Sequence, residues 1–546
     1  MAYAVSTNIS KEKREKLVQK ISAIKNYIAT APQDENTAQL LAYIADIEKD
    51  IKGKKYGLIF EEHRETIDEI LATHTPVLAE EKDLFIDNGG QMNFLIEGDN
   101  LAALQLLEKT HKGKIDVIYI DPPYNTGNKD FVYDDAFVDS NDTFRHSKWL
   151  SFMEKRLVIA KNLLSEKGVI FISIDDNEQA QVKLMCDSIF GADNFIAQVI
   201  WERAFAPVNL KKHFSESHDY VMCFAKNISK AICNGLPRSD EANGRYSNPD
   251  NDYRGPWTSG DLSVGPRVES KVYEITTPSG RKILPPSGYC WRLDEDTFKK
   301  YVKENKIWFG ENGDNVPRIK RFFSEVKQGI TPMTIWKYTE VGHSQDATKE
   351  LKAIFDGEAK FTYPKSVRLI QRIAGLYGDK NSTILDFFAG SGTTGHAVMK
   401  LNAEDGGKRK FIICTNNENN ICRDVTYERI KRVIEKENYQ TSLKYFKVDF
   451  IPISEKLYYE YADELLAHIR ELVELENGID FNGNTEIAII LTEEELDDFT
   501  ANIPADCKAI YLGHDVLPDE TQEKLFKKHG IIVNIIPDYY YRELEG

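Results

Sequence analysis

An alternation of short apolar runs with amphipathic helical periods constrains the fold of this chain more than any other feature, and it occurs in two stretches. The first stretch predicts strands at residues 94–96, 117–120 and 168–174, with helices at 100–107 and 149–164 between them. The second predicts helices at 365–376, 394–401 and 425–437 around strands at 383–388 and 411–414. Strands that alternate with helices form parallel α/β sheets. We therefore expect one α/β domain whose two halves are separated in the sequence.

The segments around this domain differ from it in pattern. Residues 201–355 lose the periodicity and are rich in Trp, Tyr, Pro and Gly, which indicates a loop-rich insertion. Apolar spacing predicts two amphipathic helices between residues 10 and 53 and a third at 61–72, which we expect to serve packing or dimerisation. Strands predicted at 487–491, 509–512 and 531–536 indicate a separate α/β module. The expected organisation is a helical region (1–90), a first half-domain (91–200), an insertion (201–355), a second half-domain (356–447) and a C-terminal module (448–546).

For binding to nucleic acid, the distribution of charged residues along the chain matters more than the net charge. The formal net charge of −17 disfavours nucleic acid by itself, because Lys and Arg supply most of the nonspecific affinity for phosphate. Residues 448–546 hold 23 Asp and Glu against 7 Lys and Arg, whereas residues 197–360 hold 25 Lys and Arg against 22 acids. The acidity therefore belongs to the C-terminal module, and the rest of the chain is able to carry basic patches.

Length and cysteine content narrow the class of protein. A chain of 546 residues exceeds one hydrophobic core, and no stretch approaches the roughly 20 apolar residues of a membrane span. The N-terminus is polar, without the apolar core of a signal peptide. We expect a soluble, cytoplasmic protein without membrane contact. The seven scattered cysteines include no Cys-x-x-Cys pair, so we expect reduced thiols and neither a disulfide framework nor a metal site.

The first candidate site is Asp121-Pro122-Pro123-Tyr124, which follows the strand predicted at 117–120. Two prolines lack N–H donors and fix φ near roughly −65°, so the turn leaves its carbonyl oxygens available as acceptors. The Asp121 carboxylate and the Pro122 C=O can then both accept from one exocyclic amino group, while Tyr124 stacks on the ring that carries it. An ordinary surface turn after a buried strand is the other interpretation of these four residues. Other motifs in the chain are needed to choose between these two interpretations.

The second candidate site is a glycine-rich loop at residues 386–395, with the sequence DFFAGSGTTG. Glycines between a strand and a helix let a ligand approach the backbone and the helix N-terminus. Gly390, Gly392 and Gly395 match the fingerprint of a nicotinamide-dependent dehydrogenase, but the next strand ends at residues 414–417 without the expected acid. His396 stands where a P-loop requires Lys, which excludes an NTPase at this loop. A dehydrogenase remains as a hypothesis.

Together the two motifs resemble those of amino-methylating DNA methyltransferases: residues 121–124 are similar to their catalytic motif, and residues 386–394 to their S-adenosylmethionine loop. The catalytic motif comes first and a long insertion follows it, which is the order of the family's β group. Segments at 98–101, 125–128, 149–153, 173–178 and 361–366 look like those of type III restriction-modification methyltransferase subunits. The resemblance covers roughly residues 56–445. It implies a circularly permuted, Rossmann-like α/β fold with an inserted target-recognition domain, S-adenosyl-L-methionine as cofactor and double-stranded DNA as substrate.

The resemblance also implies roles for individual residues. The catalytic residues would be Asp121, Pro122, Pro123 and Tyr124. The loop residues that bind the donor would be Asp386, Phe388, Ala389, Gly390, Ser391, Gly392 and Thr393. Lys365 and Ser366 would approach the donor carboxylate and Asp99 its adenine ring, although a helix cap explains Asp99 nearly as well. At the ribose position the chain departs from the family, and Asn417 takes the place of the usual acid, with Thr415, Asn416 and Glu418 beside it.

The implied reaction is methylation of the N6 amino group of adenine in a flipped-out base, because the related cytosine enzymes usually begin the motif with Ser. Three alternatives remain: an N4-cytosine methyltransferase, a solitary methyltransferase, and a recognition and docking subunit for a helicase-nuclease partner. We also expect a homodimer. The sequence contains no helicase or nuclease motif, so a restriction complex would need a second protein.

The insertion is the candidate for reading the DNA sequence, because basic and aromatic residues are mixed along it. Arg and Lys contact guanine, and aromatic rings stack on unstacked bases. The candidates are Arg203, Lys211, Lys212, Arg254, Arg267, Arg281, Arg318, Lys320, Arg321, Tyr253, Trp257, Trp291, Trp308 and Trp336. For any single one, a solvated charge or a core aromatic is the more frequent outcome. Residues 215–220, which include His218 and Asp219, resemble a family segment that follows the catalytic half-domain, and we interpret His218 as a structural histidine rather than a catalytic one.

Overall fold

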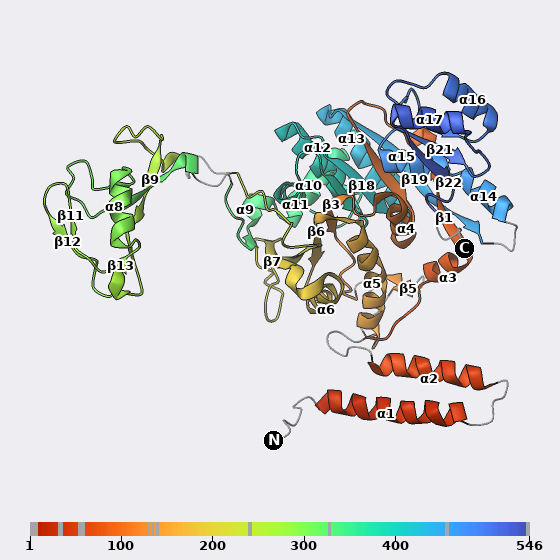
Figure 1. Ribbon diagram of the computed structural model, residues 1–546, viewed down its shortest axis with the longest axis horizontal. Helices are drawn as coiled ribbons and strands as arrows, with labels where there is room; N and C mark the ends of the chain where they lie inside the picture. Colours follow the sequence, from red (N-terminus) through yellow and green to blue (C-terminus); the bar gives the residue numbers. More distant parts are fainter. Residues whose placement is uncertain are drawn as a thin grey trace.

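The structure is a computed structural model that describes residues 9–30, 36–52, 60–127, 132–133, 136–137, 141–237, 243–325, 329–453 and 458–541. A ten-stranded mixed sheet with helices on both faces forms the central body, and two smaller parts extend from it (Figure 1). Within the described ranges, no helix has both the length and the apolar character needed to cross a bilayer.

The strands of the sheet lie in the order β1 (His74–Glu80), β19 (Thr441–Pro452), β2 (Gln91–Glu97), β18 (Lys410–Thr415), β17 (Thr383–Asp386), β3 (Ile115–Ile120), β6 (Leu164–Ile174), β8 (His218–Ala225), β7 (Phe195–Glu202) and β16 (Ile335–Trp336). The strands from β19 to β6 run parallel, whereas β1 and β8 run antiparallel to their neighbours. The α/β class predicted from the sequence is therefore confirmed.

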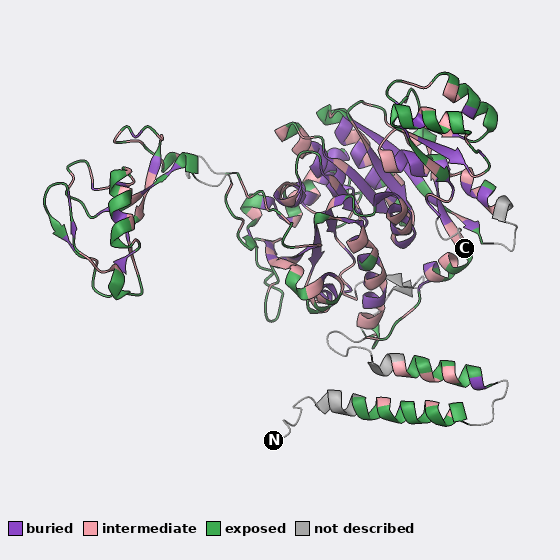
Figure 2. Cartoon of the chain, in the orientation of Figure 1, coloured by how far each residue is buried: buried purple, intermediate pink, exposed green. Residues whose placement is uncertain are grey.

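The helices cover the sheet in two layers. One layer contains α4 (Asn100–His111), α5 (Arg145–Leu163), α6 (Gln179–Cys186) and α15 (Ile469–Asn477), and the other contains α10 (Ser344–Ile354), α11 (Val367–Tyr377), α12 (Thr393–Asp405) and α13 (Glu428–Glu437). Leu104 and Leu157 belong to the core under the first layer, and Ile370 and Ile430 to the core under the second. All four side chains are fully buried, and the central strands between the layers are buried as well (Figure 2).

Strands β17 and β3 are neighbours at the centre of the sheet, and the chain leaves them in opposite directions. β17 leads through α12 to β18, whereas β3 leads through α5 to β6 on the other side. In open α/β sheets a ligand crevice forms outside the carboxyl ends of the strands at such a switch point. The two candidate motifs follow these two strands, so the topology brings both motifs to the same edge of the sheet.

Most of the aperiodic segment forms a lobe that stands apart from the central body (Figure 1). Its elements are β9 (Trp257–Asp261), β10 (Ser263–Val264), β11 (Ile275–Thr276), β12 (Lys282–Ile283), β13 (Cys290–Trp291), α8 (Glu295–Lys303), β14 (Ile307–Trp308) and β15 (Arg318–Phe322). Leu262, Trp291 and Phe298 belong to a small core of its own. Most of these strands have only two residues, which is too short for an alternating pattern to show in the sequence.

The limits predicted for the insertion differ from those in the structure. β8 falls within residues 201–355, yet it pairs with β6 from Val169↔Ala225 to Ile174↔Tyr220 in the central sheet. β16 and α10 fall within the same range and also belong to the central body. Sequence periodicity reveals neither strand, because the sequence on either side of β8 is irregular and β16 is short. The two segments that lead to the lobe meet in a bridge between Leu236 and Ile330.

The N-terminal part contains the two helices predicted between residues 10 and 53, α1 (Ile9–Thr30) and α2 (Thr37–Lys52), which form a hairpin away from the sheet (Figure 1). The third helix, α3 (Thr66–Thr73), begins later than predicted. β1 follows it at once and pairs with β19, so the helical region ends well before residue 90. Pro76 lies in β1, and this is tolerated because β1 is the edge strand of the sheet.

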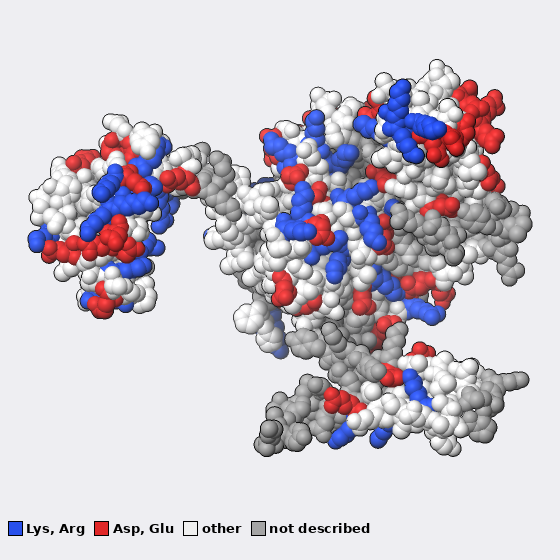
Figure 3. Space-filling view, in the orientation of Figure 1, with Lys and Arg blue, Asp and Glu red and all other residues white. Residues whose placement is uncertain are grey.

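The C-terminal part contains the three strands predicted there, β20 (Ile487–Ile490), β21 (Ala509–Gly513) and β22 (Ile532–Ile536), with α14 (Tyr458–Leu466), α16 (Glu493–Ala501) and α17 (Glu520–His529). Acidic side chains gather over α16 on the face shown in Figure 3. The predicted boundary at residue 447 falls inside β19, and α15 packs on α4 and β1. This part therefore shares the core of the central body.

Candidate active site

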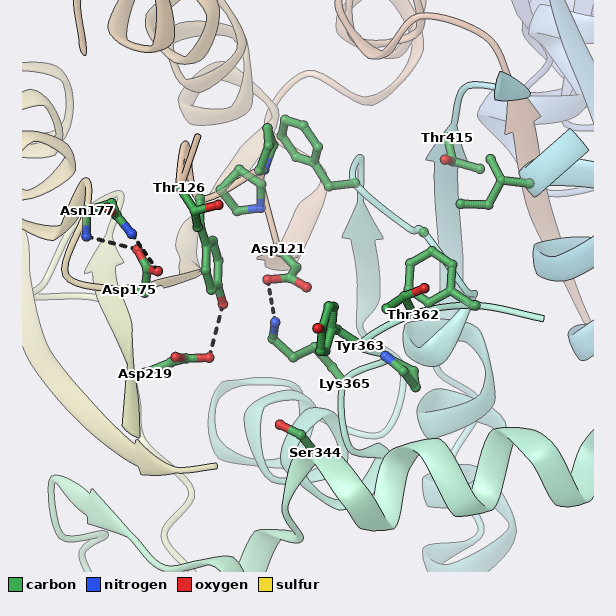
Figure 4. A pocket seen from close by; sticks show the side chains of 18 of the residues that line it. Asp121, Thr126, Asp175, Asn177, Asp219, Ser344, Thr362, Tyr363, Lys365 and Thr415 are labelled. Carbon is green, nitrogen blue, oxygen red and sulfur yellow. Dashed lines mark hydrogen bonds and ion pairs between the residues drawn. The ribbon is translucent and has the colours of Figure 1, made fainter. Parts of the chain in front are cut away.

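A cavity of about 1220 Å³ opens at the edge of the sheet where β3 and β17 end. The first motif contributes Asp121, Pro122, Pro123 and Tyr124 to its wall, and the second contributes Phe387, Phe388 and Gly390. The carboxyl ends of β2, β6 and β18 add Asp99, Asp175, Thr415 and Asn416. Figure 4 shows side chains from these separate strands pointing into one space. The two motifs predicted as functional therefore share a single cavity.

Asp121 forms an ion pair with Lys365 at the wall of the cavity (Figure 4). Lys365 Nζ lies 2.8 Å from Asp121 Oδ1, and the side chains are 12% and 27% exposed, respectively. The same ammonium group lies 4.9 Å from the centroid of the Tyr124 ring, within range of a cation–π contact. Lys365 was predicted beside a donor carboxylate, and in this structure it pairs with the carboxylate of Asp121.

The turn after β3 is held by a hydrogen bond from α5. Trp149 Nε1 donates to the Pro123 C=O at 2.7 Å. Among the residues that the structure describes, no donor is bonded to the Pro122 C=O. The Pro122 carbonyl therefore remains available as an acceptor next to the Asp121 carboxylate, as the double proline predicts.

A buried polar cluster supports the same turn from behind. Asn125 has a positive φ of 58° and is fully buried. Its Nδ2 donates to Glu178 Oε1 at 2.5 Å, and that oxygen also lies 2.6 Å from His146 Nδ1. Burial raises the pKa of Glu178 to about 8. The conformation after Tyr124 is thus fixed by side chains from α5 and from the segment before α6.

Asp219 and Arg203, which were not predicted as part of a catalytic site, line the cavity together with Tyr124. Figure 4 shows Asp219 at this wall. Tyr124 Oη donates to Asp219 Oδ2 at 3.5 Å, and Arg203 Nε lies 2.7 Å from Asp219 Oδ1. Burial raises the pKa of Asp219, and Lys365 and Arg203 oppose this rise. Burial also raises the pKa of Tyr124 well above its ordinary value, so the phenol stays neutral. The resemblance of residues 215–220 to a family segment was the signal in the sequence, and Asp219 is the second residue of β8.

The glycine-rich loop needs glycine at two positions. Gly390 (φ 48°) and Gly392 (φ 73°) both have a positive φ, which strains any other residue. A Cβ on Gly392 would lie 3.2 Å from the backbone oxygen of Thr426, and a Cβ on Gly390 would lie 3.3 Å from the Phe361 ring. Gly390 lines the cavity, whereas Gly392 caps α12 behind it. The cavity therefore reaches the backbone of the loop at Gly390.

Asp386 ends β17 and organises the loop from beneath. Its oxygens accept from Phe388 N–H at 2.9 Å and from Thr394 Oγ1 at 2.5 Å. The residue is 2% exposed and is absent from the described lining of the cavity, and burial raises its pKa to about 7. Asp386 was predicted as a donor ligand, and its contacts instead make it a support for the loop.

We expect the stability of the protein to depend on the protonation of Asp386. Folding raises its pKa from 3.8 to about 7, so the folded state holds the proton more tightly than the unfolded chain does. This contribution is complete below about pH 4 and is lost as the pH rises to 7. Asp386→Asn, which keeps the size of the side chain, should flatten the decline in urea midpoints measured from pH 5 to pH 8. The same pH dependence in both proteins would contradict the assignment.

Arg429 holds the glycine-rich loop from the side of α13. Its Nη1 donates to Ser391 C=O at 3.2 Å, to Ser391 Oγ at 3.1 Å and to Thr393 Oγ1 at 2.8 Å. Arg429 is 1% exposed, and burial lowers its pKa to about 10. Ser391 and Thr393, which were predicted to bind the donor, therefore face this guanidinium group. No motif marks Arg429, because it is one of several cations in an amphipathic helix.

The two interpretations of Asp99 both find support. Its side chain accepts from Leu101 N–H at 2.7 Å, so Asp99 is the N-cap of α4. The same residue also lines the cavity at the end of β2. Arg156, which is fully buried, lies 3.5 Å from its second oxygen.

Three other predicted residues lie behind the wall of the cavity. Ser366 is buried and donates to Val341 C=O at 2.6 Å. Asn417 Oδ1 accepts from Cys422 N–H at 3.1 Å, and Ala389 is 6% exposed. None of the three is among the residues described as lining the cavity, where Thr415, Asn416 and Glu418 stand in place of Asn417.

Several residues predicted to read DNA have structural contacts in the lobe or the body. Lys320 is 3% exposed and forms ion pairs with Asp250 and Asp252, so it is not available to DNA. Trp257, Trp291 and Trp336 are buried. Arg254, Arg267 and Arg318 each form an ion pair with an acid of the lobe. Tyr253 is 92% exposed, which leaves its ring open to a partner. The composition of the segment thus reflects the small core of the lobe as well as its surface.

Comparison with known proteins identifies the family. Residues 115–428 match the N6_N4_Mtase family, described as DNA methylase. The chain is 35% identical to the Mod subunit of the type III restriction-modification enzyme StyLTI of Salmonella typhimurium, across 65% of this chain and 57% of that subunit. It is 34% identical to the type II methyltransferase M.KpnI of Klebsiella pneumoniae, across 59% of this chain and 79% of that enzyme.

A solved structure and the coverage of these matches complete the comparison. The PvuII DNA methyltransferase, described as cytosine-N4-specific, aligns with 66% of this chain and 98% of its own at 11% identity, with a TM-score of 0.34. The chain matches less than two thirds of the length of the StyLTI Mod subunit. The family match covers more than half of this chain and contains both motifs of the cavity. The chain therefore belongs to the N6_N4_Mtase family of DNA methylases.

Proposed function

We propose that this chain is a site-specific DNA methyltransferase that transfers a methyl group from S-adenosyl-L-methionine to the N6 amino group of a flipped-out adenine. One observation carries the proposal: the turn at residues 121–124 and the glycine-rich loop at Gly390 line the same cavity at the ends of adjacent parallel strands. A methyl donor and an amine have to meet within bonding distance for this reaction. The cavity offers each of them a separate wall.

The residues around the glycine-rich loop fit the proposed donor. Gly390 exposes backbone to the cavity, Phe388 adds an apolar face, and Asp99, Asn416 and Glu418 supply polar groups at neighbouring strand ends. A nucleoside joined to an amino acid needs close approach to the backbone, an apolar surface for its base and polar partners for its hydroxyl groups. When bound, this donor supplies an electrophilic methyl group on a sulfonium.

The residues of the first motif would position the amine. Its nitrogen lone pair is delocalised into the ring, so both N–H bonds have to be held for the nitrogen to aim at the methyl group. The Asp121 carboxylate and the Pro122 C=O would accept these two bonds. Lys365 contacts one Asp121 oxygen and leaves the other for the amine. The amine becomes acidic only as the methyl group arrives, so the reaction needs positioning more than a strong base.

The test is methyl transfer by the purified chain. Duplex DNA of mixed sequence is incubated with isotopically labelled S-adenosyl-L-methionine, and the DNA is then digested to nucleosides and analysed by mass spectrometry. We expect labelled N6-methyladenine. Labelled N4-methylcytosine would replace adenine by cytosine in the proposal, and the absence of any labelled nucleoside would overturn it. Single-molecule sequencing of the product would then give the recognition site.

We further propose that the chain is the modification subunit of a type III restriction-modification system. The similarity to the StyLTI Mod subunit supports this assignment. The proposal includes a homodimer, a separate helicase-nuclease partner and a location in the cytoplasm, where bacterial DNA is found. Light scattering of the purified chain tests the dimer, and a monomer at working concentrations would contradict it.

The ring of Tyr124, rather than its hydroxyl group, should matter for the reaction. Its Oη lies 3.5 Å from Asp219, at the outer limit of a hydrogen bond, so removal of the hydroxyl should change the rate little. Stacking on a base is worth about 1–3 kcal/mol, so Tyr124→Ala should slow single-turnover methylation by roughly 5- to 150-fold. Tyr124→Phe should stay within about threefold of the wild type. Equal losses in the two variants would argue against stacking.

A further inference from the structure

The loop between β7 and β8, residues 203–217, borders the cavity and exposes large apolar side chains. Leu210 is 97% exposed, Phe214 is 88% exposed and Val208 is 51% exposed. Val208 and Lys211 line the cavity, so the tip of the loop stands beside its mouth. The loop extends past the edge of the central body below β7 (Figure 1). Exposed apolar clusters of this kind commonly mark an interaction surface.

The base of this loop is anchored to the body. Arg203 N–H and Ala204 N–H both donate to Ser217 C=O, at 2.9 and 3.1 Å. The Phe205 ring stacks on His343 with centroids 5.2 Å apart. These contacts fix where the loop leaves the sheet, so its position beside the cavity is defined.

The tip of the loop is closed by its own contacts. Val208 N–H donates to Ser215 Oγ at 2.8 Å, and Lys211 N–H donates to Val208 C=O at 3.0 Å. Leu210 lies between these closing contacts, and its side chain projects into solvent. The loop thus holds the Leu210 side chain in solvent, between Val208 and Lys211, which line the cavity.

We propose that Leu210 enters the DNA duplex at the position that the extruded target base vacates. The inference rests on the proposed function and deepens it. Extrusion of a base costs a few kcal/mol of stacking and pairing and leaves a gap in the stack. An apolar side chain that fills the gap offsets part of this cost, as the apolar wedges of DNA-bending proteins do. Val208 and Lys211, on either side of Leu210, line the cavity that the extruded base would enter, so Leu210 would stand near the gap that this base leaves.

The charges around Leu210 fit a duplex. Lys211 and Lys212 follow it directly and are exposed, whereas Arg203 at the base of the loop is paired with Asp219. Glu216 offsets part of this charge, since it lies 3.2 Å from Lys211 Nζ. Cations beside an apolar tip match a ligand with phosphates outside and stacked bases within, because Lys and Arg neutralise phosphate.

The test compares variants on paired and unpaired substrates. Single-turnover methylation is measured on a duplex that carries the mapped site, and on the same duplex with an abasic position opposite the target adenine. Leu210→Ala should be roughly tenfold slower than the wild type on the paired duplex and within about twofold on the abasic one, where little pairing has to be broken. Leu210→Met, which keeps an apolar wedge, should match the wild type on both.

A control and a second readout separate this role from a loss of structure. Leu517→Ala removes a leucine that is 77% exposed in the C-terminal part, and it should leave both rates unchanged. With 2-aminopurine in place of the target adenine and no donor added, the wild-type chain should raise the fluorescence of the duplex, and Leu210→Ala should raise it less. DNA binding measured by anisotropy should change less than the fluorescence does.

The possible outcomes are distinct. A wild-type chain that methylates no DNA overturns the proposed function and this inference together. A wild-type chain that methylates DNA, with Leu210→Ala equally fast on the paired duplex, overturns the wedge alone and assigns the loop to a protein partner. A tenfold loss on both duplexes also overturns the wedge, because the defect then lies outside base extrusion.

Discussion

Asp121→Asn should reduce methyl transfer by on the order of 10³-fold, because it removes an acceptor at the point where charge develops. The substitution keeps the size of the side chain but leaves it only one oxygen. Lys365 Nζ, 2.8 Å from Asp121 Oδ1, would hold that oxygen and turn the new NH₂ group towards the substrate amine. Two donors would then face each other where the reaction needs an acceptor and a donor.

The glycine-rich loop should keep its affinity for the donor in this variant, because Asp121 lies on the other wall of the cavity. Isothermal titration with S-adenosyl-L-methionine measures this directly. Asp176→Asn makes the same chemical change on an exposed residue that is not part of the described lining, and it should leave the rate unchanged. Activity of Asp121→Asn within tenfold of the wild type would contradict the assignment, and a parallel loss of donor binding would show that the loop itself was disturbed.

The position of both motifs could be predicted from the sequence because each of them is local. An apolar strand followed by Asp121 and two prolines, and another strand followed by the turn at Gly390, are complete within about ten residues. Their meeting in one cavity depends on the pairing of β17 with β3, two strands far apart in the chain. Periodicity finds the strands but not their neighbours. Family resemblance supplied that link before the structure confirmed it.

The residues that prediction missed depend on contacts between distant segments. Asp219 borders the cavity only because β8 runs antiparallel to β6 and begins at the edge where β6 ends. Arg429 supports the glycine-rich loop from a helix whose sequence shows only amphipathic spacing. Lys320 was one of the candidates for DNA contact, and its buried ion pairs remove it from that set, because composition cannot distinguish a buried ion pair from an exposed cation. In each case the missing information is the identity of the partner, which lies elsewhere in the chain.

The boundary predicted at residue 447 likewise overlooks contacts between distant segments. One set of these contacts surrounds a buried cation. Lys444 lies in β19 and is fully buried. Its Nζ lies 2.6 Å from Glu474 Oε2, 2.9 Å from Asp480 Oδ1 and 3.3 Å from Glu80 Oε1. Glu474 belongs to α15, beyond the predicted boundary, and is fully buried too. The charge counts of the sequence place this acid in a separate, acidic C-terminal module, whereas the structure places it in the core shared with the sheet.

Lys444→Met should destabilise the protein by about 3–5 kcal/mol, because it leaves the buried Glu474 carboxylate with only the exposed Arg470, whose Nε lies 3.4 Å from Glu474 Oε1. Urea unfolding followed by near-ultraviolet circular dichroism measures the change. Lys524→Met, which removes an exposed cation 3.3 Å from Glu520, should cost less than about 1 kcal/mol and serves as the control.

A second substitution separates the loss of the ion pair from the cost of the uncompensated buried charge that Lys444→Met leaves. Lys444→Met combined with Glu474→Leu removes both buried charges and replaces them with apolar groups of similar size, which is often close to neutral. The double variant should therefore recover at least half of the stability that the single variant loses. A double variant as unstable as Lys444→Met alone would mean that Glu80 and Asp480 dominate the pairing. A single variant as stable as the wild type would mean that residues 458–541 are not held to β19 by this cation, and that the core they share with the sheet is apolar alone.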